Sequence, residues 1–444
     1  MPRSRRYSMT ELPGTLQRSC REAQEAFRRA LDEAVRTHGA GDQAHRVAYT
    51  TLKQDFEKRG DHWIAKEHPA DCGGGGKADR LAARGNGSGQ QIQRPARLDH
   101  GARGSTGRFW WRRRGGSVMV NVGYTLMTEQ AGPKDLVRWA VRAEDTGFDL
   151  LVSSDHYFPW LDEQGHAPNA WVTLGAVAQA TERAELMTYV TCPTMRYHPA
   201  VVAQQAATLA LLSGGRFTLG LGAGENLNEH VIGEGWPDAD QRQDMLAEAV
   251  SIIRALLNGG YVNFQGSHFR VDAARIWDLP DRPVPLGVAV SGRQSCELFA
   301  PLADVMIAVE PDGSLGGWWD AASNAGQPAR KVGQMPICWG PDRDECIGRA
   351  HEQFRWFGGG WKVNAELPGT AGFAGATSFV RPEDVAGSIP CGDSVDAVAE
   401  AAGAFFKAGF TDLALVQIGG TEPEQDRFFA AAPELITALK ETAG

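Results

Sequence analysis

Two apolar stretches of the chain end abruptly in side chains that can exchange protons. Asp155 and His156 follow the apolar run 149–153, and Glu225 follows the run 217–222. A parallel α/β barrel builds its reaction centre from side chains at the carboxyl ends of its strands. An exposed imidazole can take a proton from an alcohol, and a carboxylic acid can donate one. The two strand ends therefore predict a proton acceptor and a proton donor.

The neighbours of these residues leave alternatives open. Trp160, four residues after His156, could wall off a reacting centre or simply pack. His156 itself could be structural, but its place at a barrel rim favours a site. Glu225 could instead be an N-cap acid of a helix that begins at Asn226. Asn228 carries both a donor and an acceptor for the edge of a heterocycle.

Two further strand ends carry weaker signals. Residues 189–199 contain two prolines and predict a rigid, irregular turn in which a bulge could press against a flat cofactor. Cys192 has no assignable base and is interpreted as packing, while Arg196 and His198 could equally be surface residues. Residues 291–293, Ser-Gly-Arg, open a helix whose main-chain amides could bind an anion.

Residues 120–441 alternate between strand-like and helix-like segments. The expected strands are 120–125, 149–153, 185–191, 217–222, 284–290, 304–309, 333–338 and 412–418. The expected helices are 133–146, 170–181, 199–213, 240–258, 293–302, 342–357, 394–409 and 422–441. This alternation predicts an α/β fold, a (β/α)₈ TIM barrel. A doubly wound sheet is disfavoured because the glycine-rich segment 220–224 follows the fourth strand rather than the first.

Two insertions interrupt this alternation. Residues 260–276 are expected to form a hairpin with its turn at Gln265-Gly266. Residues 358–392 are rich in Gly and Ala and are expected to form a loop over the barrel mouth.

Residues 8–68 predict a small all-α domain. Two helical stripes are expected, one running from Phe27 to Val35 and one with Val47, Ala48, Leu52 and Phe56. With Glu-Leu-Pro at its start and Lys58 to Trp63 at its end, the segment resembles the ChaB-type cation transport regulator domain. A generic helical hairpin is the alternative.

Residues 69–118 form a basic segment rich in Gly and Arg, with almost no aliphatic side chains, which predicts a disordered linker. Met119 opens the barrel domain, residues 119–444, and we hypothesise that some product begins there. N-terminal mass spectrometry of the native protein that finds only the full-length chain would reject this idea.

Composition excludes several classes of protein. The formal net charge of −9 argues against general nucleic-acid binding by the barrel, and no run of the 444 residues is long enough to span a membrane. The seven cysteines are scattered and include no C-x-x-C pair, so neither a zinc site nor a disulfide framework is expected. Their odd number fits a reducing cytoplasm, so we expect a cytoplasmic protein with no metal.

Residues 121–441 resemble the luciferase-like oxidoreductases, within them the deazaflavin-dependent group that includes the F420-dependent glucose-6-phosphate dehydrogenases. The matching motifs are Ser154-Asp155-His156, Pro159-Trp160, Gly165-His166-Ala-Pro168, Cys192-Pro193, Arg196-Tyr-His-Pro199, Gly214-Gly215-Arg216-Phe217, Gly222-Ala-Gly224-Glu225-Asn-Leu-Asn228-Glu229 and Trp236-Pro237. The resemblance implies a barrel that holds coenzyme F420 at its carboxyl-terminal mouth, in a homodimer that acts on a small molecule.

The resemblance also implies catalytic roles. His156 would take the hydroxyl proton, Glu225 would protonate the ring as hydride arrives, and Trp160 would screen the intermediate. We expect His156 and Glu225 to face one another across the flat ring. The residues that the resemblance places against the cofactor are Asp155, Tyr189, Val190, Cys192, Gly222, Ala223, Gly224, Asn228, Ala289, Val290, Ser291, Gly292 and Arg293. Tyr189-Val190 would be a bulge with a non-proline cis peptide that backs the ring.

The chain departs from the group's pattern where sugar-phosphate dehydrogenases carry Thr and basic residues. Val309, Asp312 and Gly387 stand at those places, with Glu310 between the first two. An acidic segment cannot hold a phosphate dianion, so glucose 6-phosphate is not the expected substrate. We expect a non-phosphorylated alcohol or carbonyl compound.

Two other functions remain open. One is an FMN-dependent monooxygenase that uses reduced flavin and O₂. The other is a degenerate barrel whose N-terminal segment recruits a partner. Binding titrations with F420 and FMN separate the two enzymatic functions, because reduced FMN reacts readily with O₂ whereas F420 reacts poorly.

Overall fold

The computed structural model describes residues 16, 19, 21–38, 42–59, 62–66, 90–92, 120–323 and 329–444. The chain divides into two compact units, Met1–Ser88 and Gly89–Gly444. Each unit has a hydrophobic core of its own.

The N-terminal unit is a helical pair followed by a hairpin. Its elements are α2 (Arg21–His38), α3 (Asp42–Asp55), β1 (Phe56–Arg59) and β2 (His62–Ala65). Phe27 and Leu52 pack with Trp63 in one buried cluster, and Trp63 N donates to Ser19 Oγ at 2.7 Å. The expected second stripe is partly wrong, because Val47 is exposed and Phe56 opens a strand.

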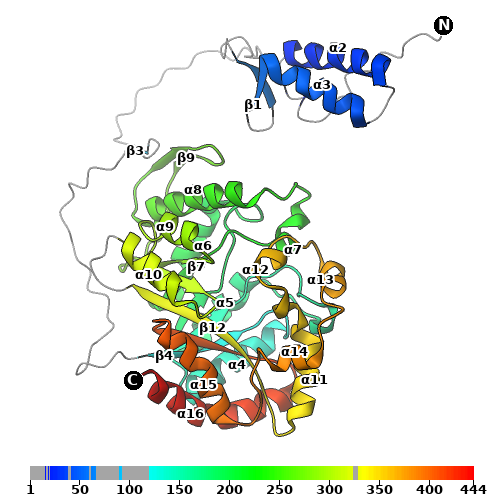
Figure 1. Ribbon diagram of the computed structural model, residues 1–444. Helices are drawn as coiled ribbons and strands as arrows, with labels where there is room; N and C mark the ends of the chain where they lie inside the picture. The colour runs from blue at the N-terminus through cyan, green and yellow to red at the C-terminus, as the bar shows by residue number, and fades with distance from the viewer. Residues whose placement is uncertain are drawn as a thin grey trace. The chain divides into compact units, whose positions relative to one another are not determined.

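The C-terminal unit contains a closed parallel barrel (Figure 1). Its strands are β4 (Asn121–Leu126), β5 (Leu150–Ser153), β6 (Glu185–Thr188), β7 (Phe217–Leu221), β10 (Leu286–Ala289), β11 (Val305–Ala308), β12 (Arg330–Trp339) and β14 (Asp412–Gln417). They pair in chain order around the ring, β11 with β12 and β12 with β14, and the pairing of the last strand, β14, with the first, β4, closes it. The predicted TIM barrel is confirmed.

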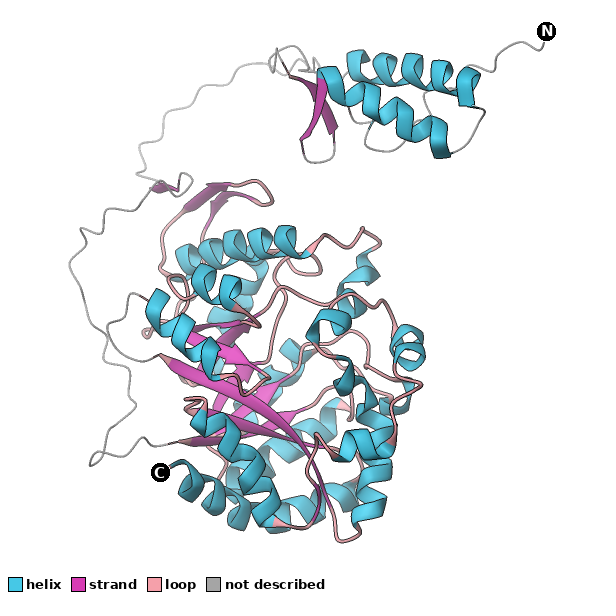
Figure 2. Ribbon diagram, in the orientation of Figure 1, coloured by secondary structure: helices cyan, strands magenta, loops and turns pink. Residues whose placement is uncertain are grey.

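Helices surround the strands, as Figure 2 shows. They are α4 (Pro133–Thr146), α5 (Ala170–Ala180), α6 (Pro199–Leu212), α8 (Ala239–Leu257), α9 (Arg293–Phe299), α10 (Gly313–Ala322), α11 (Arg343–Phe354), α15 (Val395–Lys407) and α16 (Glu422–Ala443). Local sequence sets their ends. For example, α4 has Pro133 in its first turn and ends at Gly147, whose φ of 106° suits glycine.

The barrel has an inner and an outer apolar layer. The inner layer consists of Leu150, Val152, Met187, Val305, Ile307, Val332 and Ala414. The outer layer packs the helices against the strands and includes fully buried Trp319 and Phe428. Because branched side chains fill the interior, the barrel is a packed core and its open surface is at the mouth.

The first insertion is the expected hairpin, β8 (Val262–Gln265) and β9 (Arg270–Ala274), with Gly266 N bonded to Phe269 O. β3 (Gln90–Ile92) pairs in parallel with β8. The prediction of a disordered linker did not include this strand; the other residues of 69–118 and Met119 lie outside the described residues.

The second insertion, residues 355–392, is named here the mouth insertion. Its elements are η4 (Arg355–Gly359), α12 (Trp361–Asn364), α13 (Thr370–Ala376), α14 (Pro382–Ala386) and β13 (Cys391–Gly392). The expectation of a loop is therefore wrong. The segment forms short helices, and Gly360 and Gly369 adopt positive φ at the N-caps of α12 and α13. β13 pairs with the end of β12.

Candidate active site

His156 lies beyond the end of β5, and its ring orientation is fixed. Its Nδ1 is 3.0 Å from the carbonyl oxygen of Phe158. A carbonyl only accepts hydrogen bonds, so the Nδ1 proton is held there and neutral His156 keeps its lone pair on Nε2. Nε2 lies 3.4 Å from Glu225 Oε2. The nitrogen that can accept a proton therefore faces the carboxyl group.

Glu225 follows β7 and is the N-cap residue of α7 (Asn226–Glu229), as the alternative expected, but its side chain makes no capping hydrogen bond. Its Oε2 accepts a hydrogen bond from Asn228 Nδ2 at 2.8 Å. Asn228 Oδ1 in turn accepts from the backbone N–H groups of Tyr157 and Phe158 at 2.8 and 3.2 Å. Asn228 thus cross-links the segments that follow β5 and β7.

The contact between His156 and Glu225 corrects one expectation. A flat ring between the two groups requires about 7 Å, two van der Waals contacts of about 3.5 Å each. At 3.4 Å the imidazole and the carboxyl lie side by side. A heterocycle bound at this mouth would have to lie against both groups from the same side.

Glu129, beyond the end of β4, is the member of this group that the sequence analysis missed. Its Oε1 accepts from Trp160 Nε1 at 3.1 Å and lies 3.5 Å from His156 Nδ1. Its Oε2 accepts from Ser154 Oγ at 2.5 Å and from Thr128 Oγ1 at 3.1 Å. The sequence did offer a signal for this residue, because Glu129 lies just beyond the end of the first expected strand, 120–125.

Burial and charge act on these groups in opposite directions. Burial lowers the pKa of His156, but the Glu129 and Glu225 carboxylates outweigh it and raise the pKa above its ordinary value. Burial raises the pKa of Glu225, and His156 and Asn228 offset this only in part. Both groups therefore retain a proton to a higher pH than they would in water.

A second buried group of charges lies behind Asp155. Arg196 Nη2 donates to the backbone oxygen of Asp155 at 3.0 Å, and Thr191 Oγ1 donates to Asp155 Oδ2 at 2.7 Å. Arg196 also binds Glu229 through its backbone N–H at 2.8 Å and through Nε at 3.2 Å. The Arg196 side chain is 9% exposed, so it is no surface residue. His198, in contrast, is exposed and caps α6.

Tyr189, Val190 and Ala289 are partly buried and pack on the inner layer of the barrel. The Tyr189–Val190 peptide is cis, as the family resemblance implied. Gly222 leaves room for this segment, since a Cβ there would lie 2.5 Å from Val190 Cγ2. We name Tyr189, Val190 and Ala289 the mouth floor.

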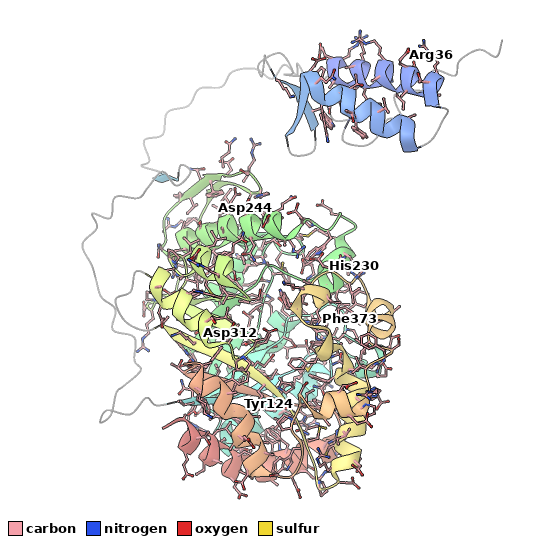
Figure 3. All side chains as sticks on the ribbon, in the orientation of Figure 1. Arg36, Tyr124, His230, Asp244, Asp312 and Phe373 are labelled. Atoms are coloured by element: carbon pink, nitrogen blue, oxygen red, sulfur yellow. The ribbon has the colours of Figure 1, made fainter. Side chains whose placement is uncertain are left out.

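Trp160 connects the site to the mouth insertion. Its ring stacks on Trp356 with centroids 4.1 Å apart and planes 8° apart. Phe373, labelled on α13 in Figure 3, meets it edge-on at 5.2 Å, and the His156 ring lies at 4.9 Å. Trp160 is only 5% exposed, so it packs as well as flanking the imidazole.

The remaining residues that were expected to contact the cofactor make contacts within the chain. Cys192 is buried close under Gly224, where a Cβ would lie 2.5 Å from its sulfur. The N–H groups of Ser291 and Gly292 donate to Ser295 Oγ, and exposed Arg293 pairs with Glu297. The expected anion-binding groups are thus engaged within the chain. Ala223 packs against the outer layer, and Val290 N donates to Ile307 O. Contacts of these residues with a cofactor stay predictions.

Across the part of the chain that the structure describes, no cluster of His, Cys, Asp and Glu is arranged to hold a metal ion. None of the described helices is long and apolar enough to cross a membrane.

The family model of the luciferase-like monooxygenases matches residues 114–412, which include the first seven barrel strands and only the first residue of β14. The chain belongs to the luciferase-like monooxygenase family. The ChaB model matches residues 12–66, so the N-terminal resemblance is confirmed as well.

Named relatives within this luciferase-like family carry F420 in their descriptions. The F420-dependent glucose-6-phosphate dehydrogenase of Amycolatopsis mediterranei (strain U-32) is 47% identical over 175 residues, 39% of this chain and 53% of the relative. The F420-dependent hydroxymycolic acid dehydrogenase of Mycobacterium tuberculosis is 43% identical over 191 residues, 43% of this chain and 53% of the relative. The matches thus span about half the length of these relatives.

Among solved structures, an F420-dependent secondary alcohol dehydrogenase in complex with an F420-acetone adduct superimposes with a TM-score of 0.66. It is 27% identical, and the match covers 72% of this chain and 99% of that one. These named relatives are thus F420-dependent oxidoreductases.

Proposed function

We propose that the chain is an F420-dependent oxidoreductase that moves a hydride between coenzyme F420 and a non-phosphorylated alcohol or its carbonyl product. The contact between His156 Nε2 and Glu225 Oε2 carries the proposal, because it joins a proton acceptor and a proton donor at the barrel mouth. The named relatives support the choice of cofactor.

The residues at the mouth fit a deazaflavin. The mouth floor of Tyr189, Val190 and Ala289 is apolar and partly exposed, as a surface under a flat ring needs to be. When bound there, F420 supplies a two-electron hydride acceptor or donor. Asp155 is fixed by Arg196 and Thr191, so its backbone offers a rigid edge to the site.

His156 accepts the hydroxyl proton at Nε2 when the substrate alcohol is oxidised. Its Nδ1 proton stays on the carbonyl oxygen of Phe158, and the buried Glu129 carboxylate stabilises the imidazolium that results. Glu225 holds a proton at a carboxyl whose raised pKa keeps it available for donation. Trp160, under Trp356 and Phe373, excludes water from the imidazole.

The acidic residues that follow β11 favour a substrate without a phosphate group. Val309, Glu310 and Asp312 are exposed there, and Asp312 accepts a hydrogen bond from Ser314 N at 2.8 Å. Hydrogen bonds from Ser314 lower the pKa of Asp312, so this carboxylate is charged at neutral pH. Gly387 offers no side chain. Two negative charges repel a phosphate dianion rather than bind it.

Anaerobic titration with F420 and, separately, with FMN tests the cofactor. We expect saturable binding of F420, and alcohol-dependent bleaching of its absorbance in a panel that includes secondary alcohols and glucose 6-phosphate. His156→Ala and Glu225→Gln should lose turnover by at least about 100-fold. His198→Ala, an exposed histidine outside the site, is the matched control.

Three outcomes contradict the proposal. Binding of FMN without F420, followed by O₂ consumption, would favour the monooxygenase. Turnover of glucose 6-phosphate would refute the substrate class. Unchanged turnover in both site variants would refute the assigned roles.

We also propose a homodimer formed through α5 and α6. Both helices are mostly apolar, and beside the polar Gln179, Gln204 and Thr208 their outer faces leave Val172, Val201, Leu211 and Leu212 exposed by 76, 46, 45 and 44%. A helix that is apolar on its outer face commonly packs against a partner. Light scattering should give twice the chain mass, and Val172→Glu with Leu211→Glu should give the monomer. A wild-type monomer contradicts this.

The domain boundaries 8–68, 69–118 and 119–444 remain our proposal for the full chain. We also propose a cytoplasmic location. It fits the five cysteines at 192, 296, 338, 346 and 391, which are free thiols in the part of the chain that the structure describes.

A further inference from the structure

Three cysteines meet where the mouth insertion returns to the barrel. Cys338 is the last residue but one of β12, Cys346 lies on α11, and Cys391 begins β13. Cys338 and Cys391 are register partners in the parallel pairing of β12 with β13, and Cys338 N donates to Pro390 O at 2.8 Å. Register partners on neighbouring strands lie about 4.8 Å apart and point to the same face. That separation is within the range that a disulfide requires.

The three thiols interact through Cys338, which shifts the pKa of both Cys346 and Cys391. Cys338 Sγ donates to the backbone oxygen of Ile418 at 3.8 Å, and Cys391 Sγ donates to that of Ile389 at 3.3 Å. Arg349 Nε donates to Cys338 Sγ at 3.3 Å, and Arg349 Nη2 donates to Cys346 Sγ at 3.5 Å. Glu424 and the backbone oxygen of Trp339 hold the guanidinium in place. This positive charge favours the thiolate forms of Cys338 and Cys346, but burial and the neighbouring thiols outweigh it and raise the pKa of both.

The three thiols differ in access to solvent. Cys338 and Cys346 are 0 and 1% exposed, whereas Cys391 is half-buried. The hydrogen bond from Cys338 lowers the pKa of Cys391. For Cys338, the bond with Cys346 lowers the pKa, but the bond with Cys391 and burial raise it to about 12. The accessible thiol is thus the more acidic one, beside a protected partner, which is the arrangement of a redox-sensing cysteine and its resolving cysteine.

We propose that Cys391 is an oxidation site for hydrogen peroxide and that it forms a reversible disulfide with Cys338. The Cys391 thiolate attacks one peroxide oxygen, the O–O bond breaks, and hydroxide leaves, which gives a sulfenic acid at Cys391. The Cys338 sulfur then attacks the Cys391 sulfur, and the hydroxyl leaves as water with the Cys338 proton. In sum, two thiols lose two electrons and two protons, and one peroxide becomes two waters.

The disulfide would act on the mouth insertion. Cys391 is at its return end, and Cys338 and Cys346 share one buried apolar cluster with Trp160, Trp356 and Phe373. A covalent link from β13 to β12 fixes this end of the insertion, so opening of the cover over Trp160 becomes less frequent. Oxidation of Cys391 by peroxide would thus change how often the barrel mouth opens.

Peptide mapping after peroxide treatment of the reduced full-length chain tests the disulfide. We expect a Cys338–Cys391 cross-linked peptide, two hydrogens lighter than the reduced pair and reversed by dithiothreitol. Cys391→Ser and Cys338→Ser should abolish it, and Cys296→Ser, a buried cysteine on α9, should leave it unchanged. Sulfonic acid at Cys391 without a cross-link, or a Cys338–Cys346 cross-link instead, overturns the proposal.

Chymotrypsin cleavage after Phe379, which is 78% exposed in the mouth insertion, tests the consequence. The oxidised chain should be cut at least about tenfold more slowly than the reduced chain, since a disulfide commonly shifts an opening equilibrium by more than this factor. Cys391→Ser should show no difference after peroxide. Equal rates in the wild-type chain would overturn the effect on the insertion. Neither assay requires F420, so both stand apart from the proposed function.

Discussion

Replacing Arg196 with methionine tests whether the buried charges behind Asp155 hold the site together. The guanidinium lies 3.2 Å from Glu229 and 3.5 Å from Asp155, and both carboxylates are at most 1% exposed. Methionine keeps much of the side-chain volume but removes the charge. Removing one partner of a buried ion pair costs about 3–5 kcal/mol because the other charge stays buried without compensation. We expect Arg196→Met to lose about this much free energy of unfolding.

The loss should depend on pH in a defined direction. Burial raises the pKa of Glu229 even beside Arg196, and removal of the arginine raises it further. A carboxyl group whose folded pKa lies above its unfolded pKa destabilises the fold when it is charged. The deficit of Arg196→Met is therefore complete above the folded pKa and shrinks as pH falls through it. The double variant Arg196→Met, Glu229→Gln should recover part of the loss at pH 7.

Thermal unfolding followed by circular dichroism measures both effects. With about 2.1 cal mol⁻¹ K⁻¹ of unfolding entropy per residue, the deficit corresponds to a midpoint lower by roughly 4–7 °C for a barrel of this size. Arg381→Met, which breaks an exposed pair with Asp384, is the control and should shift the midpoint little. An unchanged midpoint in Arg196→Met, or a deficit that grows at low pH, would refute the reasoning.

Three more substitutions probe the site. Glu129→Gln removes a carboxylate that raises the pKa of His156. We therefore expect kcat/KM, measured as a function of pH, to keep its full value down to a lower pH than in the wild type. An unchanged pH dependence contradicts this. Trp356→Ala leaves a cavity over Trp160 and should cost about 3–5 kcal/mol in denaturant unfolding, with Trp356→Phe much milder. Gly222→Ala forces its Cβ onto Val190 and should cost about 1–3 kcal/mol; wild-type stability would mean that the mouth floor adapts.

The barrel could be predicted because its elements are long and carry clear patterns. Each of the eight expected strands overlaps an observed one, and the expected α4 matches from Pro133 to Thr146. The helices of the mouth insertion could not be predicted, because helices such as α12 (Trp361–Asn364) are too short to show a helical period in the sequence. α10 (Gly313–Ala322) was missed for another reason, since glycine in its first half masks the pattern that Trp319 anchors.

The site could be predicted only as far as single strand ends reveal it. His156 and Glu225 follow apolar runs, and this pattern is local in the sequence. The pairing of Arg196 with Glu229 joins the turn after β6 to α7 and depends on how those segments fold back. Nothing local shows that the His156 and Glu225 side chains would meet directly rather than across a ring.

The direct contact has a structural cause. Glu129, His156 and Glu225 come from the ends of β4, β5 and β7, and the β6 end between the last two carries Tyr189 and Val190 of the mouth floor. Parallel pairing sets Leu126 beside Ser153, which brings Glu129 under the imidazole, and Asn228 draws the segment after β7 toward the segment after β5. Because successive side chains of a strand point to opposite faces, a shift of one residue in the β4–β5 register would turn this alignment away from the mouth. The contact between His156 and Glu225 thus depends on barrel register as much as on the two residues themselves.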